Sequence, residues 1–289
     1  MDNWLQKALH KANDHSTLHE IRRVYGGSIN KTFFVETETG QYFIKHHMNA
    51  PERFFVSEAE GLELIRQTNT VAVPEVYAVS DAKNAAFLVM EWVEGRKMAD
   101  TEKKLGERIA GLHKHIGNKH GFFEASFIGA LPQPNGLFSS WLEYYRDRRL
   151  GAQLQQGIDR HRITGKRRRQ METLLVRLGE WIPEKVEPSC LHGDLWGGNW
   201  LVGPGGEPYV IDPSVLYGDR HFELAFTELF GGFSQTFYDA YKERFPLDDN
   251  YADMKPLYQL YYLLVHLNLF GESYGAHVDA ILKRYVGEG

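Results

Sequence analysis

Aromatic and β-branched residues gather in two short segments of the N-terminal third. Residues 31–37 and 41–46 carry them, and the turn Glu38-Thr39-Gly40 separates the two segments. Runs of this composition joined by a short turn with glycine predict a β-hairpin. Two further strands are predicted at residues 73–79 and 86–93.

Helical spacing of apolar residues appears once in this region and dominates after it. Phe55, Glu58, Leu62 and Ile65 are spaced as one face of a helix between the hairpin and the later strands. Beyond residue 100, longer apolar stripes at helical spacing are Leu105-Ile109-Leu112-Ile116 and Met171-Leu174-Leu175-Leu178-Ile182. Two short strands, at 200–202 and 209–211, interrupt the helical pattern, and the remainder is predicted to be helical.

The change of pattern near Glu94-Gly95 predicts a division of the 289-residue chain into two lobes. The sequence predicts an α+β fold, in which residues 1–94 form a small lobe with an antiparallel sheet. Residues 95–289 would form a larger, mainly helical lobe. We therefore expect any functional site to combine residues from both.

Composition narrows the function classes. The net charge of −5 argues against a general nucleic-acid binder, which needs a basic face. The apolar stretch 257–270 is too short to span a bilayer and contains polar residues, so we expect a buried core helix and no membrane partner. Only one cysteine, Cys190, is present and no secretory signal is recognisable, which together favour a cytoplasmic protein.

The strongest chemical signal is a pair of motifs in the second lobe. The first, at 191–199, reads Leu-His-Gly-Asp-Leu-Trp-Gly-Gly-Asn, and the second, at 210–213, reads Val-Ile-Asp-Pro. Phosphoryl transfer needs a positioned hydroxyl group and neutralised phosphate charge. Asp194 would accept the hydroxyl proton, while Asn199 and Asp212 offer the hard oxygen ligands that Mg²⁺ requires. Each motif alone also suits a surface turn, but their combination favours a kinase that uses ATP and Mg²⁺.

These motifs resemble those of the fructosamine kinase (ketosamine-3-kinase) family, in a form like its bacterial members. That family belongs to the aminoglycoside- and choline-kinase-like enzymes, which have a protein-kinase-like fold. The resemblance extends to Tyr217-Gly218-Asp219-Arg220, to Phe127-Ile128-Gly129 with Pro132-Gln133-Pro134-Asn135, and to Phe230-Gly231-Gly232-Phe233. It implies ATP-dependent phosphorylation of a fructosamine or ribulosamine, at O3, as a step in deglycation. The substrate would be a small-molecule or protein-linked glycated amine.

The same resemblance assigns roles in the first lobe. Lys45, at the end of a hairpin strand, resembles the lysine that binds the α- and β-phosphates. Its expected partner is Glu58, which lies on the inward stripe of the predicted helix, and Glu60 is the alternative. Adenine would pair with backbone groups of Glu91 and Val93. The turn that contains Gly27 and Ser28 precedes the hairpin and would cover the phosphates.

Trp196, Gln133 and Asn135 are the candidates for the wall that holds the rest of the substrate. An indole beside the proposed base can stack on a sugar or an amine substituent, although it can equally pack the lobe. Relatives often carry a tryptophan shortly after this asparagine, where Leu137-Phe138 stands here. This departure bears on the sugar preference more than on the reaction.

Other residues have a structural interpretation. His192 and His113 are expected to pack and to form hydrogen bonds. Glu223 resembles an acid that braces the catalytic loop, or it is simply an acid at a helix start. The alternatives to a ketosamine kinase are an aminoglycoside or other small-alcohol kinase of the same fold, and a nucleotide-binding pseudokinase.

Overall fold

The N-terminal part of the protein is an antiparallel sheet with two helices. The computed structural model describes residues 3–24, 30–82 and 86–288. The sheet has the strand order β1-β2-β3-β5-β4. Its elements are α1 (Asn3–Lys11), β1 (Leu18–Val24), β2 (Lys31–Thr37), β3 (Gln41–His47), α2 (Phe54–Gln67), β4 (Val76–Ser80) and β5 (Ala86–Glu91). The predicted hairpin is β2–β3, and the predicted helix is α2.

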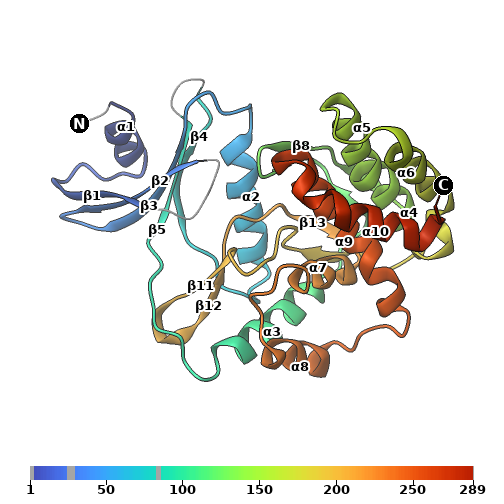
Figure 1. The fold of residues 1–289 in the computed structure, drawn as a ribbon. Helices are drawn as coiled ribbons and strands as arrows, with labels where there is room; N and C mark the ends of the chain where they lie inside the picture. The colour runs from blue at the N-terminus through green and yellow to red at the C-terminus, as the bar shows by residue number, and fades with distance from the viewer. Residues whose placement is uncertain (1–2, 25–29, 83–85, 289) are drawn as a thin grey trace.

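Alternation along the interior strand β5 explains how one sheet holds two helices. Val89 belongs to a core cluster that includes Leu5 of α1. Leu88 and Met90 belong to a second cluster, which includes Leu62 of α2. Because successive strand residues point to opposite faces, α1 and α2 cover opposite faces of the sheet, as Figure 1 shows.

Two N-terminal elements, β1 and α1, were not predicted. Strand β1 is an edge strand whose residues from His19 to Arg23 are exposed, so it lacks the apolar run that marks a buried strand. Helix α1 buries few residues, namely Leu5, Ala8 and Leu9. Both elements are stabilised by contacts with the sheet rather than by a strong local pattern.

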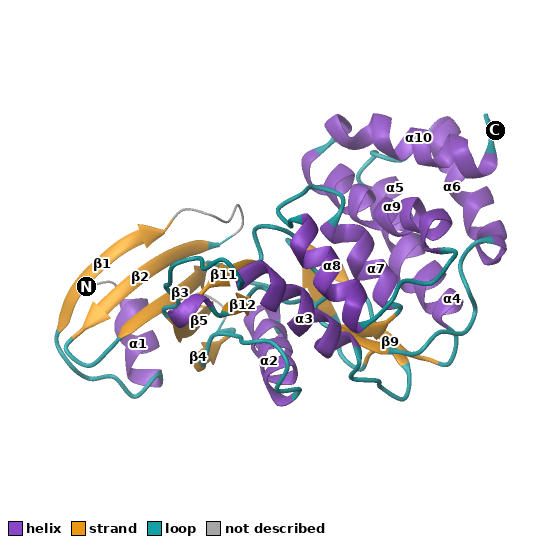
Figure 2. Cartoon of the chain, turned by 90° about the horizontal axis from the view of Figure 1, so that it is seen from below, coloured by secondary structure: helices purple, strands orange, loops and turns teal. Residues whose placement is uncertain are grey.

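The C-terminal part is mainly helical, and Figure 2 shows it beside the strand-rich part. A connection without regular structure follows β5, and the predicted lobe boundary at Glu94 falls within it and stays a prediction. The helices are α3 (Thr101–His113), α4 (Trp141–Tyr144), a π-helical segment (Tyr145–Leu150), α5 (Gly151–Asp159), α6 (Gly165–Arg177), α7 (Arg220–Thr227), α8 (Gln235–Arg244), α9 (Tyr251–Phe270) and α10 (Gly275–Val286). Short 3₁₀ turns occur at Leu178–Glu180, Pro204–Gly206 and Glu272–Tyr274.

Helix α9 is the centre of the helical core. Its residues from Leu257 to Val265 are almost all buried, and it packs against α5, α7 and α10. The prediction of a buried core helix over 257–270 is therefore confirmed. Within the part of the chain that the structure describes, no helix is both long and apolar enough to cross a membrane.

Small sheets bring the two sequence motifs together. Their strands are β6 (His120–Phe122), β7 (Ser126–Ile128), β8 (Leu131–Gln133), β9 (Gly136–Phe138), β10 (Ser189–Leu191), β11 (Trp200–Val202), β12 (Pro208–Val210) and β13 (Leu216–Gly218). Strand β10 pairs with β13, and β11 pairs with β12. The segments 192–199 and 211–215 therefore leave neighbouring strands at the same place.

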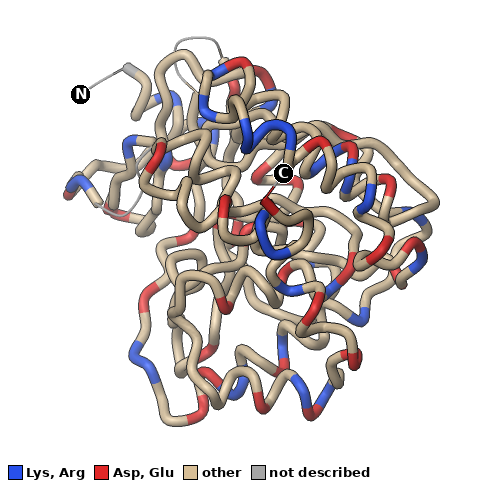
Figure 3. The backbone as a smooth tube through the Cα atoms, turned by 45° about the vertical axis from the view of Figure 1, so that its right-hand side comes forward, with Lys and Arg blue, Asp and Glu red and all other residues tan. Residues whose placement is uncertain are grey.

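Charged residues of both signs are distributed over the chain, as Figure 3 shows. The segment 160–169 is rich in arginine and lysine, and part of its charge is paired. Arg167 contacts both Glu272 and Asp279 at hydrogen-bonding distance. These ion pairs hold α6 against the chain around α10, so this basic segment has a structural role.

Candidate active site

The loop that follows β10 is held in place by hydrogen bonds between His192 and the segment 211–214. The Nε2 atom of His192 lies 2.8 Å from the carbonyl oxygen of Ile211, and the amide of Ser214 donates to the carbonyl of His192 over 2.8 Å. Gly193 has a φ of +85°, and a Cβ atom there would lie 1.9 Å from the carbonyl oxygen of Ser214. This close approach requires glycine. The loop thus presents Asp194 at a defined position.

Glu223 on α7 braces the same loop. Its carboxylate accepts the amides of His192, at 3.2 Å, and Gly193, at 2.5 Å. The ring of His113 lies 2.8 Å from the same carboxylate, and its other nitrogen lies 2.8 Å from the hydroxyl of Tyr241. Burial alone would raise the pKa of Glu223, but these hydrogen bonds and the neighbouring histidines hold it below its usual value. A buried carboxylate therefore fixes the backbone beside Asp194.

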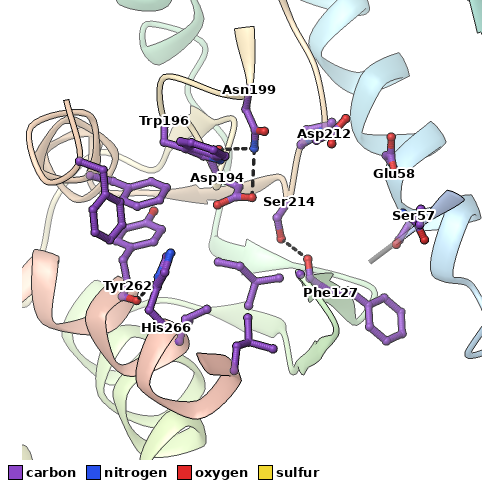
Figure 4. Close-up of a pocket in the computed structure, with 18 of the residues that line it drawn as sticks. Ser57, Glu58, Phe127, Asp194, Trp196, Asn199, Asp212, Ser214, Tyr262 and His266 are labelled. Atoms are coloured by element: carbon purple, nitrogen blue, oxygen red, sulfur yellow. Dashed lines mark hydrogen bonds between the residues drawn. The ribbon is translucent and has the colours of Figure 1, made fainter. Parts of the chain in front are cut away.

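Asp194 and Asn199 form one hydrogen-bonded unit. The Nδ2 atom of Asn199 donates to the backbone carbonyl of Asp194 at 2.8 Å and to its Oδ2 atom at 3.1 Å. This arrangement leaves the Oδ1 atom of Asn199 on the side of Asp212 (Figure 4). One amide therefore orients the carboxylate of Asp194 and presents an oxygen to a cation.

Lys45 joins the N-terminal sheet to the two C-terminal motifs at the same place. Its Nζ atom lies 2.7 Å from Oε1 of Glu58 and 2.6 Å from Oδ1 of Asp212. Glu60 instead contacts Arg53, at 2.7 Å, on the surface. Of the two candidate glutamates, the structure places Glu58 beside Lys45.

The electrostatics of this cluster favour a bound cation. Burial, followed by the negative charge of Asp212, raises the pKa of Asp194 well above its usual value. Burial likewise raises the pKa of Glu58 to about 7, despite the attraction of Lys45. Burial would lower the pKa of Lys45, but Asp212 and Glu58 outweigh it, so its pKa is raised. Among the described residues that line this space, three carboxylates face one lysine, and a divalent cation would relieve their mutual repulsion.

The oxygen donors present fit Mg²⁺. Asp212 has a φ of 57°, a left-handed conformation that aspartate tolerates, and its Oδ1 atom is bound by Lys45. Asn199 supplies an amide oxygen nearby. No group of three or more His, Cys, Asp or Glu side chains suited to a metal occurs in residues 3–24, 30–82 and 86–288. Mg²⁺ is commonly held by one or two carboxylates together with phosphate oxygens and water, so this sparse donor set suits a metal that arrives with a nucleotide.

A cavity of about 520 Å³ connects these charged groups with an aromatic wall. Trp196, which is 39% exposed, lines it beside Asp194. The rest of the aromatic wall was missed in the sequence, and its members are Phe226, Phe230, Tyr262, His266, Phe270 and Tyr274. His266 and Phe270 are one helical turn apart on α9, a spacing that could have indicated a shared face within the apolar run.

The structure does not place Gln133 and Asn135 on this cavity wall. Gln133 is 2% exposed, and the amide of Asn135 bonds to the carbonyl of Glu124 and to the hydroxyl of Tyr144. Neither is among the residues that line the cavity beside Asp194. Their predicted contact with substrate has no support from this arrangement, because internal partners already occupy these amide groups.

The other predicted nucleotide contacts remain predictions. The amide of Glu91 donates to the carbonyl of Glu75 over 2.8 Å, so only its carbonyl group could accept from adenine. Val93 lies just beyond β5, in the connection between the lobes. Gly27 and Ser28 fall outside the described residues.

Comparisons with known proteins agree with this geometry. The sequence model of the fructosamine kinase family matches residues 1–288. A protein named probable ketoamine kinase from Enterococcus faecium is 37% identical over 263 residues, which cover 91% of this chain and 94% of that protein. The chloroplastic protein-ribulosamine 3-kinase of Arabidopsis thaliana is 32% identical, covering 92% of this chain and 82% of that one.

A solved structure shows the same fold. The crystal structure of a candidate fructosamine-3-kinase from Haemophilus somnus superposes with a TM-score of 0.87 at 27% identity, covering 97% of this chain and 96% of that chain. The predicted protein-kinase-like fold is thereby confirmed. With the family match over nearly its whole length, the chain belongs to the fructosamine kinase family.

Proposed function

We propose that this enzyme transfers the γ-phosphoryl group of MgATP to a hydroxyl group of a ketosamine. The observation that carries the proposal is the convergence of Asp194, Asn199, Asp212 and Lys45 on one cavity. The acceptor we infer is O3 of a fructosamine or ribulosamine, free or linked to a protein. Relatives named ketoamine kinase and ribulosamine 3-kinase support this substrate class. The phosphorylated product would decompose to release the amine, which makes the enzyme a deglycation factor.

Each residue has a distinct part in this reaction. Asp194 accepts the proton of the attacking hydroxyl as the general base. Asn199 orients that carboxylate through its Nδ2 atom. Lys45, held by Glu58, exchanges its contact with Asp212 for phosphate oxygens. Bound Mg²⁺ would supply charge neutralisation at the phosphates, and Asp212 and Asn199 would hold it.

The aromatic wall suits the remainder of the substrate. A ketosamine joins a polyhydroxyl chain to an amine that is often protonated. Trp196 offers a π-face beside Asp194, and aromatic faces attract both sugar C–H groups and cations. We infer that the sugar lies between Trp196 and Asp194. The single buried cysteine, Cys190, suits action in a reducing compartment such as the cytoplasm.

The deciding experiment compares kcat/KM on matched substrates. Fructosyl- and ribulosyl-lysine should be phosphorylated at least about a hundredfold more efficiently than kanamycin or choline. Phosphorus NMR of the product should place the phosphate on O3, and Asp194→Asn controls for contaminating kinases. Efficient turnover of kanamycin without turnover of ketosamines would overturn the substrate class, while an inactive chain that still binds MgATP would support a pseudokinase.

A further inference from the structure

Arg149 is a buried cation whose polar partners carry no negative charge. It is 0% exposed and lies in the π-helical segment between α4 and α5. Its Nη1 atom donates to the carbonyls of Pro134 and Arg148, each at 3.1 Å, and its Nη2 atom donates to Oδ1 of Asn135 at 2.9 Å. Neutral oxygen atoms therefore surround this guanidinium group.

The side-chain amide of Gln133 completes the hydrogen-bond partners of Arg149. The orientation of this amide follows from its contact with Ser214. The Ser214 hydroxyl has one proton, which it donates to the carbonyl of Phe127 over 2.9 Å (Figure 4). Gln133 must therefore donate its amide nitrogen to the Ser214 oxygen, at 3.0 Å. Its oxygen then accepts from Nη2 of Arg149 at 2.7 Å and from Nε at 3.2 Å. All five N–H groups of Arg149 are thus satisfied.

Gln133 consequently links Arg149 to the turn that carries Asp212. Ser214 lies two residues after Asp212, and its own amide is bonded to the carbonyl of His192. The left-handed conformation of Asp212 persists only if its surroundings hold it, because such conformations carry a strain of about 1 kcal/mol or more. The hydroxyl and the amide of Ser214 supply that constraint on one side of the turn.

A buried arginine without a carboxylate partner destabilises a fold, so its presence at this position calls for a reason. Burying a charge is unfavourable, and apolar residues of similar size often stabilise a fold more. Arginine alone offers five donors in a rigid planar fork, which can immobilise two amides at once. The rings of Tyr144 and Tyr261 lie 4.7 Å and 5.9 Å from the guanidinium carbon and add cation–π contacts. The π-helical turn is of a kind that is often found at functional sites.

We propose that Arg149 is a positioning residue for the metal-binding turn, which it holds through the side chains of Gln133 and Ser214. The proposal rests on the proposed function, because it assigns the turn to Mg²⁺. It also gives the Pro132-Gln133-Pro134-Asn135 segment a role: its amides orient Arg149 and transmit that orientation, and they lie outside the substrate cavity.

The first test is the substitution Gln133→Glu. A glutamate still accepts from Arg149, and so the fold is retained, but it cannot donate to Ser214. Titration calorimetry of the full chain with ADP, at a series of Mg²⁺ concentrations, should show Mg²⁺-dependent binding weakened by about five- to tenfold, the loss expected for one hydrogen bond. Gln170→Glu is the matched control, because this buried glutamine also donates a hydrogen bond through its side-chain amide, to the carbonyl of Gly287, but lies on α6.

The control should bind within about twofold of the unsubstituted chain, since a twofold change lies well below the loss of one hydrogen bond. Equal binding by Gln133→Glu and the unsubstituted chain would overturn the proposal. So would equal weakening in the control, which would show a general loss of stability. Absence of Mg²⁺-dependent binding in the unsubstituted chain would overturn the proposed function, and this inference with it, which separates the two failures.

A double-mutant cycle tests Arg149 itself. Arg149→Lys keeps the charge but loses the planar fork, and Ser214→Ala removes the far end of the chain of hydrogen bonds. Arg149 and Ser214 are not bonded to each other, so coupling between them must pass through Gln133. We expect the double variant to bind Mg²⁺-ADP within about twofold of Ser214→Ala alone, which is the non-additivity expected of a linked pair. Additive losses would overturn the proposal.

Discussion

Two buried cations are attached to opposite ends of the turn Asp212-Pro213-Ser214, and their surroundings differ. Lys45 contacts two carboxylates, those of Glu58 and Asp212. Arg149 contacts neutral oxygens and aromatic rings, and it reaches the turn through Gln133. Lys45 lines the cavity, whereas Arg149 does not. One cation is thus accessible to a ligand, and the other is sealed.

The two sets of partners differ in whether a ligand can replace them. A carboxylate partner of Lys45 can be replaced by a phosphate oxygen, because both are anionic acceptors of similar geometry. The amide partners of Arg149 have no competitor from the cavity beside Asp194, because Arg149 is fully buried and does not line that cavity. Substitutions around Lys45 should therefore change catalysis and nucleotide affinity, while those around Arg149 should act only through the geometry of the turn.

The largest effect on catalysis should come from the residues that line the cavity, at Asp194. Asp194→Asn keeps the shape and the hydrogen bond to Asn199 but removes the proton acceptor. We expect kcat to fall by about 10²- to 10⁴-fold, as for the loss of a general base, with ADP affinity retained. Steady-state kinetics and calorimetry measure the two quantities. Near-normal turnover would exclude Asp194 as the base.

Asp212→Ala should have the next largest effect, on metal dependence. It removes a carboxylate that we assign to Mg²⁺ and leaves Lys45 paired with Glu58 alone. Nucleotide binding should then respond little to Mg²⁺, which calorimetry with and without the ion would show. If this variant kept the full Mg²⁺ response, the metal would have to be held elsewhere.

Three substitutions in the N-terminal part of the chain should have graded effects on catalysis. Lys45→Ala should impair kcat and ATP affinity most, Glu58→Ala less, and Glu60→Ala hardly at all. Glu60 only forms an exposed pair with Arg53, and such pairs contribute about 0–1 kcal/mol. Kinetics of the three variants under one set of conditions give the order. A larger defect at Glu60 than at Glu58 would contradict it.

Glu223→Gln should act mainly on the stability of the fold. The substitution weakens two backbone hydrogen bonds, so we expect a loss of about 1–3 kcal/mol in the free energy of unfolding. Because the pKa of Glu223 is lowered in the folded state, its contribution is present above the usual glutamate pKa and is lost as pH falls through the lowered value.

Denaturant unfolding over a pH series measures that contribution. The difference in the free energy of unfolding between the unsubstituted chain and Glu223→Gln should be largest at neutral pH and should decrease in acid. A difference that does not change with pH would mean that the charge of Glu223 has no part in it.

Local sequence patterns predicted much of the fold. The β2–β3 hairpin, α2 and the long apolar helix α9 follow from strong periodic patterns, and the structure contains each of them. The predicted strand at 73–79 begins later, at Val76, because residues 73–75 form a connection that follows the bridge between Ala72 and Tyr209. Strand β1 could not be predicted, since an exposed edge strand has no apolar alternation to recognise.

The candidate site shows the same division. Asp194, Asn199 and Asp212 could be named from sequence because short, glycine-rich motifs place chemical groups at fixed spacing. Glu58 could be preferred to Glu60 because a helical stripe indicates which side faces inward. Gln133 and Asn135 were assigned to the substrate because their motif is distinctive, but a motif does not reveal whether its polar groups face a ligand or a buried partner.

The sequence by itself determined the reaction class and indicated the residues to which we assign the chemistry, since both depend on residue type and local spacing. Only the tertiary structure decided which groups share the cavity, that α9 supplies an aromatic wall, and that Arg149 is satisfied by amides. The shared cavity joins residues more than a hundred positions apart, such as Lys45 and Asp212. Contacts of that kind depend on how helices and sheets pack, and local patterns along the chain do not encode them individually.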